Sequence, residues 1–328
     1  MKIAFHLYFM TLRGTEVATY DFARYNEEIL GNESIIIFTN INALKARKKP
    51  SEFEAFTQGR DPLRFRVYEY YNHPFTEEGQ KNIAEIMDHE HCMHLYNHEL
   101  FSDSTWAIPH KYILVHATFR WCPAHGDRFI HTSEWLARPT GNQYVPLIVD
   151  LPQVEGDMRE ELGIPQEARV FGRYGGATTF SIPFVHDTIH EIVHHNKDIY
   201  FLFMNTNTFM PKHPQVIHLP GSSDNEVKSR FINTADAMLH ARLDGETFGL
   251  AVAEFSIHNK PVITYAHPPC KAHIEQLGRD ALLYEQASDL YRLLENFRPC
   301  DDKNWDHYSE QFSPQPVMEA FNEKFLNL

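Results

Sequence analysis

The sequence predicts an α/β protein made of two Rossmann-like domains, each built on a doubly wound parallel sheet. Two observations lead to this prediction: apolar runs alternate with amphipathic stretches along almost the whole chain, and a second such series begins at Ala168. Alternating strand and helix patterns favour parallel sheets with helices on both faces. The chain has 328 residues, which exceeds the size at which one hydrophobic core usually stops growing.

The first half opens with a strand, a helix and a second strand. Lys2–Phe9 is predicted as a strand, Thr15–Leu30 as a helix and Ser34–Phe38 as the next strand. Ala18 and Phe22 begin an apolar stripe at helical spacing. The charged stretch 45–61 is expected to be a loop or an exposed helix. Further strands are predicted at Arg66–Tyr70, Cys92–Tyr96, Tyr112–His116, Arg128–Thr132 and Tyr144–Val149.

The second half repeats this alternation after a predicted linker between Pro146 and Pro165. Strands are predicted at Val170–Tyr174, Ile199–Asn205, Val216–Leu219, Ala237–Ala241, Val262–Tyr265 and Leu282–Tyr284. Helices are predicted at Pro183–His195, Asp224–Asn233, Phe248–His258, Leu290–Phe297 and Val317–Leu326. We therefore expect residues 1–150 to form an N-terminal domain and residues 151–310 a C-terminal domain. Residues 311–328 are expected to form a helix that packs near the domain junction.

The composition excludes several classes of protein. A formal net charge of −14 argues against broad binding to nucleic acids or anionic membranes, which requires a basic surface. The sequence contains no run of about 18 apolar residues, so no transmembrane helix is predicted. The cysteines are far apart and form no C-x-x-C pair, a pattern typical of reduced thiols in a cytoplasmic protein; they are Cys92, Cys122, Cys270 and Cys300.

The loop after the predicted strand Ala237–Ala241 has the features of an anion site. Ligands of doubly wound sheets bind beyond the carboxyl ends of the strands. A helix is predicted to begin there at about Thr247 or Phe248, so the free amides of Phe248, Gly249 and Leu250 would point outward at the positive end of the helix dipole. Such an end suits a phosphate group. Gly249 would also let the backbone approach it closely.

Two carboxylates flank these amides. Glu246 precedes the helix and Glu254 lies two turns into it. A carboxylate accepts two hydrogen bonds well, which matches the neighbouring hydroxyls of a ribose or a hexose. The spacing alone is equally compatible with an ordinary helix, in which Glu246 is a charge near the N-terminus and Glu254 a solvated side chain.

The segment from Glu246 to Glu254 resembles the E-x7-E signature of retaining GT-B glycosyltransferases, especially those of family 4. Gly172-Arg173 is similar to the Gly-Arg pair of that family, and Leu219-Pro220-Gly221 to its base-contacting glycine loop. The resemblance implies two Rossmann-like domains that face a central cleft. It further implies transfer of a sugar from a nucleotide-diphosphate sugar to a glycan or another hydroxyl acceptor. Retention of anomeric configuration is implied as well, with no metal and no cofactor besides the donor.

The resemblance also assigns roles to residues of the second domain. Glu254 would hold the ribose hydroxyls, the amides from Phe248 to Leu250 the diphosphate, and Glu246 the hydroxyls of the transferred sugar. Arg173 would neutralise the departing diphosphate, because a guanidinium stays charged and binds phosphate with two parallel bonds. Gly221 would border the nucleotide base.

One departure from the family concerns a lysine expected about five residues after Arg173, where Thr178 and Thr179 stand. Losing that cation would remove stabilisation of the leaving group. Arg242, Lys228 and Arg13 are the candidates to replace it. Arg242 is the nearest in sequence to the predicted phosphate-binding amides.

In the first domain, the resemblance points to Gly14 and His116. Gly14 follows the first strand, where the family has a glycine loop, and a plain turn is an equal explanation. His116 ends a predicted strand and would contact the transferred sugar or the acceptor hydroxyl; a histidine satisfied in the core is the alternative. The stretch from His89 to His94 lacks the H-E-x-x-H spacing, so no metal site is expected. A helix end that runs into the strand Cys92–Tyr96 is expected there instead.

Two other functions remain open on the sequence. A sugar-nucleotide epimerase or a phosphorylase could share this architecture, and so could a non-catalytic protein that binds nucleotide sugars. The expected donor is linked to UDP, GDP or ADP. The sequence does not indicate the base, the sugar, the acceptor or the oligomeric state.

Overall fold

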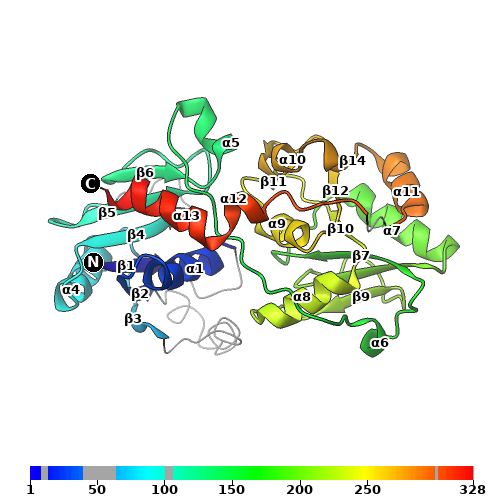
Figure 1. Ribbon diagram of the computed structural model, residues 1–328, viewed down its shortest axis with the longest axis horizontal. Coiled ribbons are helices and arrows are strands. Elements are labelled where there is room, and N and C mark those ends of the chain that lie inside the picture. Colours follow the sequence, from blue (N-terminus) through cyan, green and yellow to red (C-terminus); the bar gives the residue numbers. More distant parts are fainter. Residues whose placement is uncertain (9–13, 40–63, 100–105, 300–301, 328) are drawn as a thin grey trace. The chain divides into compact units, whose positions relative to one another are not determined.

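The computed structural model describes residues 1–8, 14–39, 64–99, 106–299 and 302–327. The chain divides into two compact units (Figure 1): the first unit comprises Met1–Ile148 with Gln311–Leu328, and the second unit comprises Val149–Glu310. Each unit is built on one six-stranded parallel sheet. The predicted loop at residues 45–61 and the candidate cation Arg13 lie outside the described residues.

The sheet of the first unit has the strand order β3-β2-β1-β4-β5-β6. Its strands are β1 (Lys2–Leu7), β2 (Glu33–Thr39), β3 (Arg66–Tyr70), β4 (His94–Glu99), β5 (Tyr112–Ala117) and β6 (Arg128–His131). Its helices are α1 (Gly14–Glu28), α4 (Glu77–His89), the short α5 (Glu134–Ala137), α12 (Ser309–Phe312), which spans the division between the units, α13 (Pro314–Phe321) and the π-helix η4 (Asn322–Leu326).

The C-terminal segment packs on the N-terminal helix within the first unit. Helix α13 lies beside α1 (Figure 1), and the rings of Phe22 and Phe321 are 5.2 Å apart. Phe22 and Ala18 are fully buried, as expected of the apolar stripe of α1. The last residues of the chain therefore complete the core around β1 and β4.

Two features of the first unit differ from the sequence prediction. Residues 144–149 form no strand, apart from a single bridge between Tyr144 and His131. Pro146 lacks the amide that continued pairing needs. Of helix α4 only the end near His89 was predicted, and its start was not, although Thr76 is a regular N-cap whose hydroxyl accepts a hydrogen bond from the amide of Gly79 at 3.1 Å.

The sheet of the second unit has the order β14-β12-β10-β7-β8-β9. Its strands are β7 (Arg169–Tyr174), β8 (Ile199–Met204), β9 (Val216–Leu219), β10 (Ala237–His240), β12 (Val262–Tyr265) and β14 (Leu282–Tyr284), and a separate pair is formed by β11 (Gly245–Glu246) and β13 (Cys270–Lys271). Its helices are α6 (Arg159–Leu162), α7 (Pro183–His195), α8 (Asn225–Thr234), α9 (Leu250–Ile257), α10 (Ala272–Leu277) and α11 (Ala287–Asn296).

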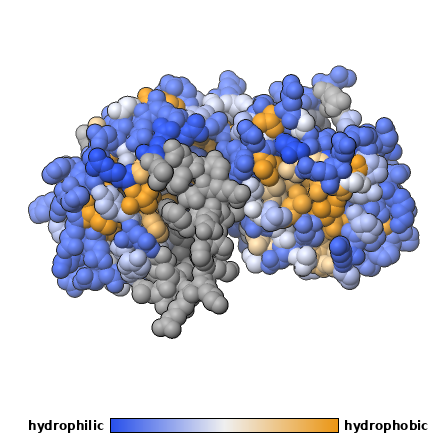
Figure 2. All heavy atoms as spheres, turned by 90° about the horizontal axis from the view of Figure 1, so that it is seen from below, coloured by the Kyte–Doolittle hydropathy of each residue, from blue (hydrophilic) through white to orange (hydrophobic). Residues whose placement is uncertain are grey.

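Hydrophilic residues cover most of the described surface on the face shown in Figure 2, with smaller hydrophobic areas between them. This is the distribution expected of a chain with 23% charged residues and a mean hydropathy of −0.43. Within the described ranges, no helix is long and apolar enough to cross a membrane. The described cysteines form no disulfide.

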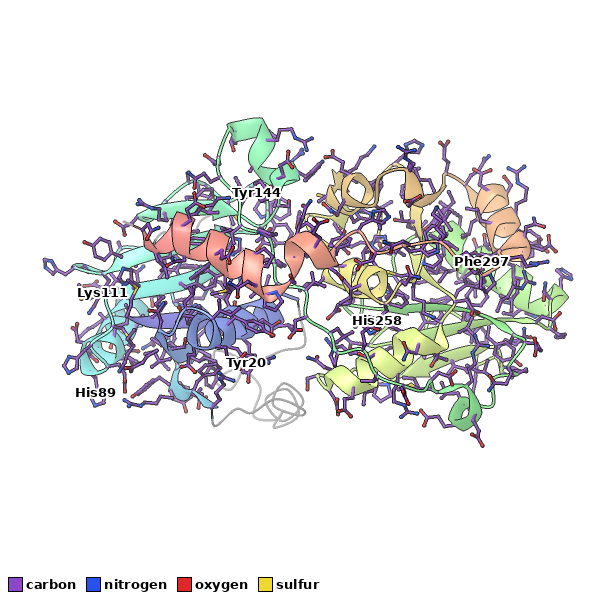
Figure 3. The ribbon with its side chains drawn as sticks, viewed as in Figure 1. Tyr20, His89, Lys111, Tyr144, His258 and Phe297 are labelled. Atoms are coloured by element: carbon purple, nitrogen blue, oxygen red, sulfur yellow. The ribbon has the colours of Figure 1, made fainter. Side chains whose placement is uncertain are left out.

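Helices cover both faces of the second sheet. Phe171 belongs to the core cluster formed with α7 and α11, and its ring lies 5.4 Å from that of Phe297 at the end of α11 (Figure 3). The next residue, Gly172, points to the opposite face, where a side chain would meet Ala235 at 2.7 Å and Phe255 of α9 at 3.4 Å. Glycine at this position therefore lets the helices on that face pack closely against β7.

Candidate functional site

The second sheet reverses its winding between β7 and β10, because β8 and β9 follow on one side and β12 and β14 on the other. Ligands of open α/β sheets bind at such a switch point, beyond the carboxyl ends of the strands. Arg173 and Tyr174 end β7, and His240 ends β10. The predicted site residues of the second domain lie around these strand ends.

The guanidinium of Arg173 is buried and held by three neighbours. It donates hydrogen bonds to the hydroxyl of Thr206, to the hydroxyl of Thr179 at 2.5 Å and to the carbonyl of Gly176 at 3.1 Å. Only 4% of the residue is exposed, and this burial lowers the pKa of Arg173 to about 10, partly offset by the charge of Glu246. Thr179, which stands where the family has a lysine, thus positions the cation that is present.

Glu246 lies beside two basic side chains. Its carboxylate is 2.8 Å from Nη1 of Arg242 and 3.3 Å from Nε2 of His240. Burial alone would raise the pKa of Glu246, but the hydrogen bond from His240 and the charge of Arg242 outweigh burial and lower it to about 2. Glu246 is therefore ionised at neutral pH.

A line of buried polar groups continues inward from Glu246. His240 contacts Thr264 through Nδ1 at 2.8 Å, and the same hydroxyl lies 3.1 Å from Nε2 of His273. Burial and the nearby His240 lower the pKa of His273 to about 3, so this ring is neutral. The line fixes the orientation of the His240 ring and, through it, one oxygen of Glu246.

Glu254 lies in the second turn of α9 and is hydrogen-bonded to two side chains. It accepts a hydrogen bond from the hydroxyl of Tyr174 at 2.5 Å and another from Lys228 of α8 at 2.9 Å. Glu254 and Lys228 are each 8% exposed. Burial and the adjacent Glu254 charge raise the pKa of Tyr174 well above its usual range. Lys228 was one candidate to replace the expected lysine, but its ammonium group is already paired with Glu254.

Helix α9 begins later than the sequence suggested. Gly249 is its N-cap, with a left-handed φ of 95°, and the first helical bond runs from the Ala253 amide to the Gly249 carbonyl. Phe248 therefore precedes the helix. The amides without an intrahelical acceptor are those of Leu250, Ala251 and Val252. A side chain at position 249 would be strained by this φ and would press on Glu246 at 3.2 Å. His258, labelled in Figure 3, ends the helix.

Gly221 follows β9 and lies against Asn205. A side chain at Gly221 would meet Asn205 at 3.1 Å, and Asn205 in turn donates a hydrogen bond to the carbonyl of Gly175 at 2.8 Å. The loops after β7, β8 and β9 are thus tied together. This contact places Gly221 at the same carboxyl edge of the sheet as Arg173.

The two residues predicted in the first domain have different surroundings. His116 is fully buried in β5: Nδ1 lies 2.6 Å from the Tyr96 hydroxyl and Nε2 lies 2.7 Å from the Val145 carbonyl. Burial lowers the pKa of His116 to about 3. Both ring nitrogens are thereby occupied, which leaves none for a sugar hydroxyl, so the core alternative describes this histidine. Gly14 is the exposed first residue of α1, and its role stays a prediction.

Several polar residues of this site were not singled out from the sequence. Tyr174 and Thr206 contact the predicted site residues Glu254 and Arg173 only through the fold, because their partners lie 80 and 33 positions away. Thr264 joins His240 to His273, and neither histidine was predicted. His240 had one usable signal, its place at the end of a predicted strand. Among the described residues, no group of three or more His, Cys, Asp or Glu side chains could hold a metal ion.

No protein-family model matches the chain, and no curated protein matches its sequence. Solved structures do match it. The Anabaena protein HepE in complex with UDP and glucose is 13% identical over the whole of both chains, with a TM-score of 0.71. A glycosyltransferase from Rickettsia africae is 13% identical over 100% of this chain and 99% of its own, with a TM-score of 0.68. The UDP-GlcNAc 2-epimerase of Methanocaldococcus jannaschii is 12% identical over 98% and 100%, with a TM-score of 0.53.

At these identities the likenesses show the fold. Together with the two six-stranded parallel sheets, they confirm the predicted α/β class with two Rossmann-like domains, which is the GT-B fold class. Glycosyltransferases and epimerases share that fold. The choice between their reactions depends on the chemistry of the site.

Proposed function

We propose that the chain is a glycosyltransferase that moves a sugar from a nucleotide-diphosphate sugar to a hydroxyl of a glycan or another acceptor. The transfer retains the anomeric configuration, needs no metal and uses no cofactor besides the donor. One observation above all supports this proposal. Arg173, Arg242, Glu246 and the N-terminus of α9 gather at the carboxyl ends of β7 and β10, beside the buried Glu254.

The proposed donor site combines three kinds of group. The amides of Leu250, Ala251 and Val252 at the start of α9 bind the diphosphate, aided by the helix dipole. Glu246 accepts bonds from hydroxyls of the transferred sugar, and Glu254 from those of the ribose. Glu254 already accepts two bonds, but a carboxylate has about four lone-pair sites, so it retains acceptor capacity for the ribose.

The proposed reaction is a front-face substitution. The bond between the anomeric carbon and the diphosphate oxygen breaks while the acceptor oxygen bonds to the same face of that carbon. The acceptor's hydroxyl proton passes to the departing diphosphate. Arg173 and the α9 amides stabilise the negative charge that develops there; such pre-arranged donors are typically worth about 3 kcal/mol each. Retention in this scheme rests on the resemblance to family 4.

Arg242 is our choice for the second cation in place of the family's lysine. Its side chain is 27% exposed and its Nη1 contacts Glu246 at 2.8 Å, next to the start of α9. Lys228 instead pairs with Glu254, and both of their side chains are 10% exposed. Arg242 can therefore reach a ligand without leaving a buried carboxylate unpaired.

Product analysis tests the proposal. The protein is incubated with UDP-, GDP- or ADP-glucose and a set of soluble oligosaccharides, with and without a chelator, and the products are followed by proton NMR. We expect a lengthened oligosaccharide whose new linkage has the anomeric configuration of the donor, formed equally well with chelator. A new linkage with the opposite anomeric configuration to the donor would contradict the front-face mechanism. No product with any donor would contradict the transferase.

A UDP-sugar epimerase is the second candidate, favoured by the likeness to the M. jannaschii enzyme. The same NMR experiment separates the two reactions, with UDP-GlcNAc added as a donor. An epimerase changes the configuration of UDP-GlcNAc at the carbon that bears the acetamido group, without any acceptor. A transferase consumes its donor in proportion to the lengthened acceptor.

A further inference from the structure

The first unit exposes one tryptophan at the carboxyl edge of its sheet. Of the four tryptophans in the chain, Trp106, Trp135 and Trp305 are at most 9% exposed, whereas Trp121 is 57% exposed. Tryptophan is highly buried on average, so an exposed ring of this size suggests a binding surface. Trp121 lies in the turn after β5, four residues beyond the end of that strand. Ligands of parallel sheets bind at this edge.

The Trp121 ring is stacked on a second aromatic ring. The centroids of Phe119 and Trp121 are 4.4 Å apart and their planes differ by 9°. Beside them, the guanidinium of Arg120 lies 3.7 Å over the ring of Trp135, the second residue of α5. Among the described residues, the Arg120 guanidinium has no hydrogen-bond acceptor. The edge therefore presents a flat ring next to a positioned set of N–H donors.

The turn is fixed to the neighbouring strand. The carbonyl of Glu99, at the end of β4, accepts hydrogen bonds from the Thr118 amide at 3.2 Å and from the Cys122 thiol at 3.6 Å. The Cys122 amide also donates to the Phe119 carbonyl at 3.4 Å. These bonds hold the backbone on both sides of Trp121, which reduces the entropy lost when a ligand binds.

We infer that Trp121 is a stacking platform for a pyranose ring of the glycan acceptor, with Arg120 donating hydrogen bonds to that sugar's hydroxyls. The apolar C–H face of a pyranose matches the electron-rich face of an indole. The platform suits one or two sugar rings. An aromatic side chain buries roughly 150–250 Å², far less than the roughly 800 Å² per partner that a stable protein interface buries. The inference rests on the proposed transferase reaction for the identity of the ligand.

The test uses the exposed ring itself as a reporter. Acrylamide quenching of tryptophan fluorescence is measured with and without cellotriose, maltotriose or mannotriose. We expect at least one of them to protect the protein from quenching with a Kd on the order of 1 mM, a usual weak-binding range. The Trp121→Phe variant should lose the protection signal. Trp121→Ala should lose at least about tenfold in affinity by ligand-observed NMR.

Tyr112→Ala is the matched control. Tyr112 is 43% exposed and stacks on His94 at 5.2 Å, but it begins β5 at the opposite edge of the same sheet. This variant should bind the trisaccharide as the wild type does. Equal losses in Tyr112→Ala and Trp121→Ala, or no protection by any trisaccharide up to about 10 mM, would overturn the platform. Concentration-dependent burial of Trp121 in a dimer would overturn it too.

UDP binding, followed by the melting temperature of the same samples, separates this inference from the proposed function. Stabilisation by UDP without trisaccharide protection would contradict the platform and leave the donor site standing. Trisaccharide protection without any effect of UDP, GDP or ADP would contradict the transferase and leave a glycan-binding surface.

Discussion

The two units have the same sheet topology, but different side chains surround the carboxylates at their switch points. Each sheet places its first strand beside its fourth, so that the winding reverses between β1 and β4 in one unit and between β7 and β10 in the other. At the first switch point the fully buried Glu99 accepts hydrogen bonds from Tyr8, Asn97 and Trp106, and its carboxylate lies 3.7 Å from Nε2 of His125. At the second, the buried Lys228 and the partly exposed Arg242 each pair with a carboxylate. The same fold thus carries two strand edges, and the edge of the second unit pairs its carboxylates with Lys228 and Arg242.

This difference indicates where a charged ligand can bind. Charges are kept out of water only when they are paired or hydrogen-bonded, since desolvation is costly. The second unit buries the charged side chains of Arg173, Lys228 and Glu254, which are 4% to 8% exposed. Under the proposed function, the groups bound there are a diphosphate and sugar hydroxyls. The predictions below test whether the two edges differ as we describe, from the largest expected effect to the smallest.

Arg173→Met should have the largest effect. Removing the guanidinium leaves the leaving group with fewer donors, so we expect sugar transfer to fall by about 100- to 1000-fold. The measurement is kcat with saturating donor and acceptor. Arg292→Met, which removes a 72% exposed side chain on α11, should leave kcat unchanged. A loss of less than about tenfold in a folded Arg173→Met protein would argue that Arg173 is structural.

Lys228→Met should destabilise the second unit by about 3 kcal/mol, because Glu254 remains buried without its cation. Urea unfolding measures the free energy. The double variant Lys228→Met with Glu254→Met should regain most of the loss. The corresponding change in the first unit, Arg24→Met, breaks a pair whose side chains are about a third exposed and should cost less than about 0.5 kcal/mol. If Lys228→Met and Arg24→Met lowered the free energy of unfolding by similar amounts, the two units would not differ in how much their ion pairs stabilise them.

Acid should destabilise the first unit through its buried histidines. Burial lowers the pKa of His6 and of His116 from 6.5 to about 3, and that of His98 well below 6.5. The unfolded chain binds protons below pH 6.5 and the folded chain does not, so stability falls as the pH drops from 6.5 toward 3. At pH 4.5 we expect a loss on the order of 2 kcal/mol for His6 and for His116.

Urea unfolding at pH 7 and 4.5 measures this loss. His116→Phe should show a smaller difference between the two pH values, even if the variant is less stable at both. An unchanged difference would mean that His116 is protonated in the folded chain. His273 of the second unit, whose pKa is also lowered to about 3, adds to the wild-type effect with the same sign.

Arg242→Gln should have the smallest effect on stability, below about 1 kcal/mol, because its pair with Glu246 is partly exposed. The pKa of Glu246 should rise from about 2 toward its ordinary value of 4.5. Since the lowered pKa stabilises the folded chain above pH 4.5 and this contribution is lost as the pH falls toward 2, the variant should lose less stability over that interval. Carbon NMR of labelled glutamate measures the pKa; an unshifted value would mean that His240 alone lowers it.

Much of the second unit follows from local patterns. Helix α7 and the strands β9, β12 and β14 have the predicted boundaries, because each has a clear apolar pattern in the sequence. The start of α9 was two residues off. The left-handed Gly249 is the N-cap there, and a side chain at this position would press on Glu246. The apolar periodicity of the sequence does not reveal this backbone conformation.

The partners of the site residues could not be predicted for a different reason. Lys228 and Glu254 are 26 positions apart on separate helices, and they meet only because α8 and α9 cover the same face of the sheet. Likewise, the residue type of Thr179 suggested a missing cation. Its contact with Arg173, which gives Thr179 a positioning role, required the loop after β7 to fold back.

Hydrogen exchange with and without UDP tests the central contrast most directly, because it locates the ligand on one edge or the other. If the second unit binds the nucleotide, the amides of residues 249–252 at the start of α9 should exchange more slowly with UDP, and those at the ends of β1 and β4 should not change. No protection by UDP, or protection confined to the strand ends of the first unit, would contradict the account.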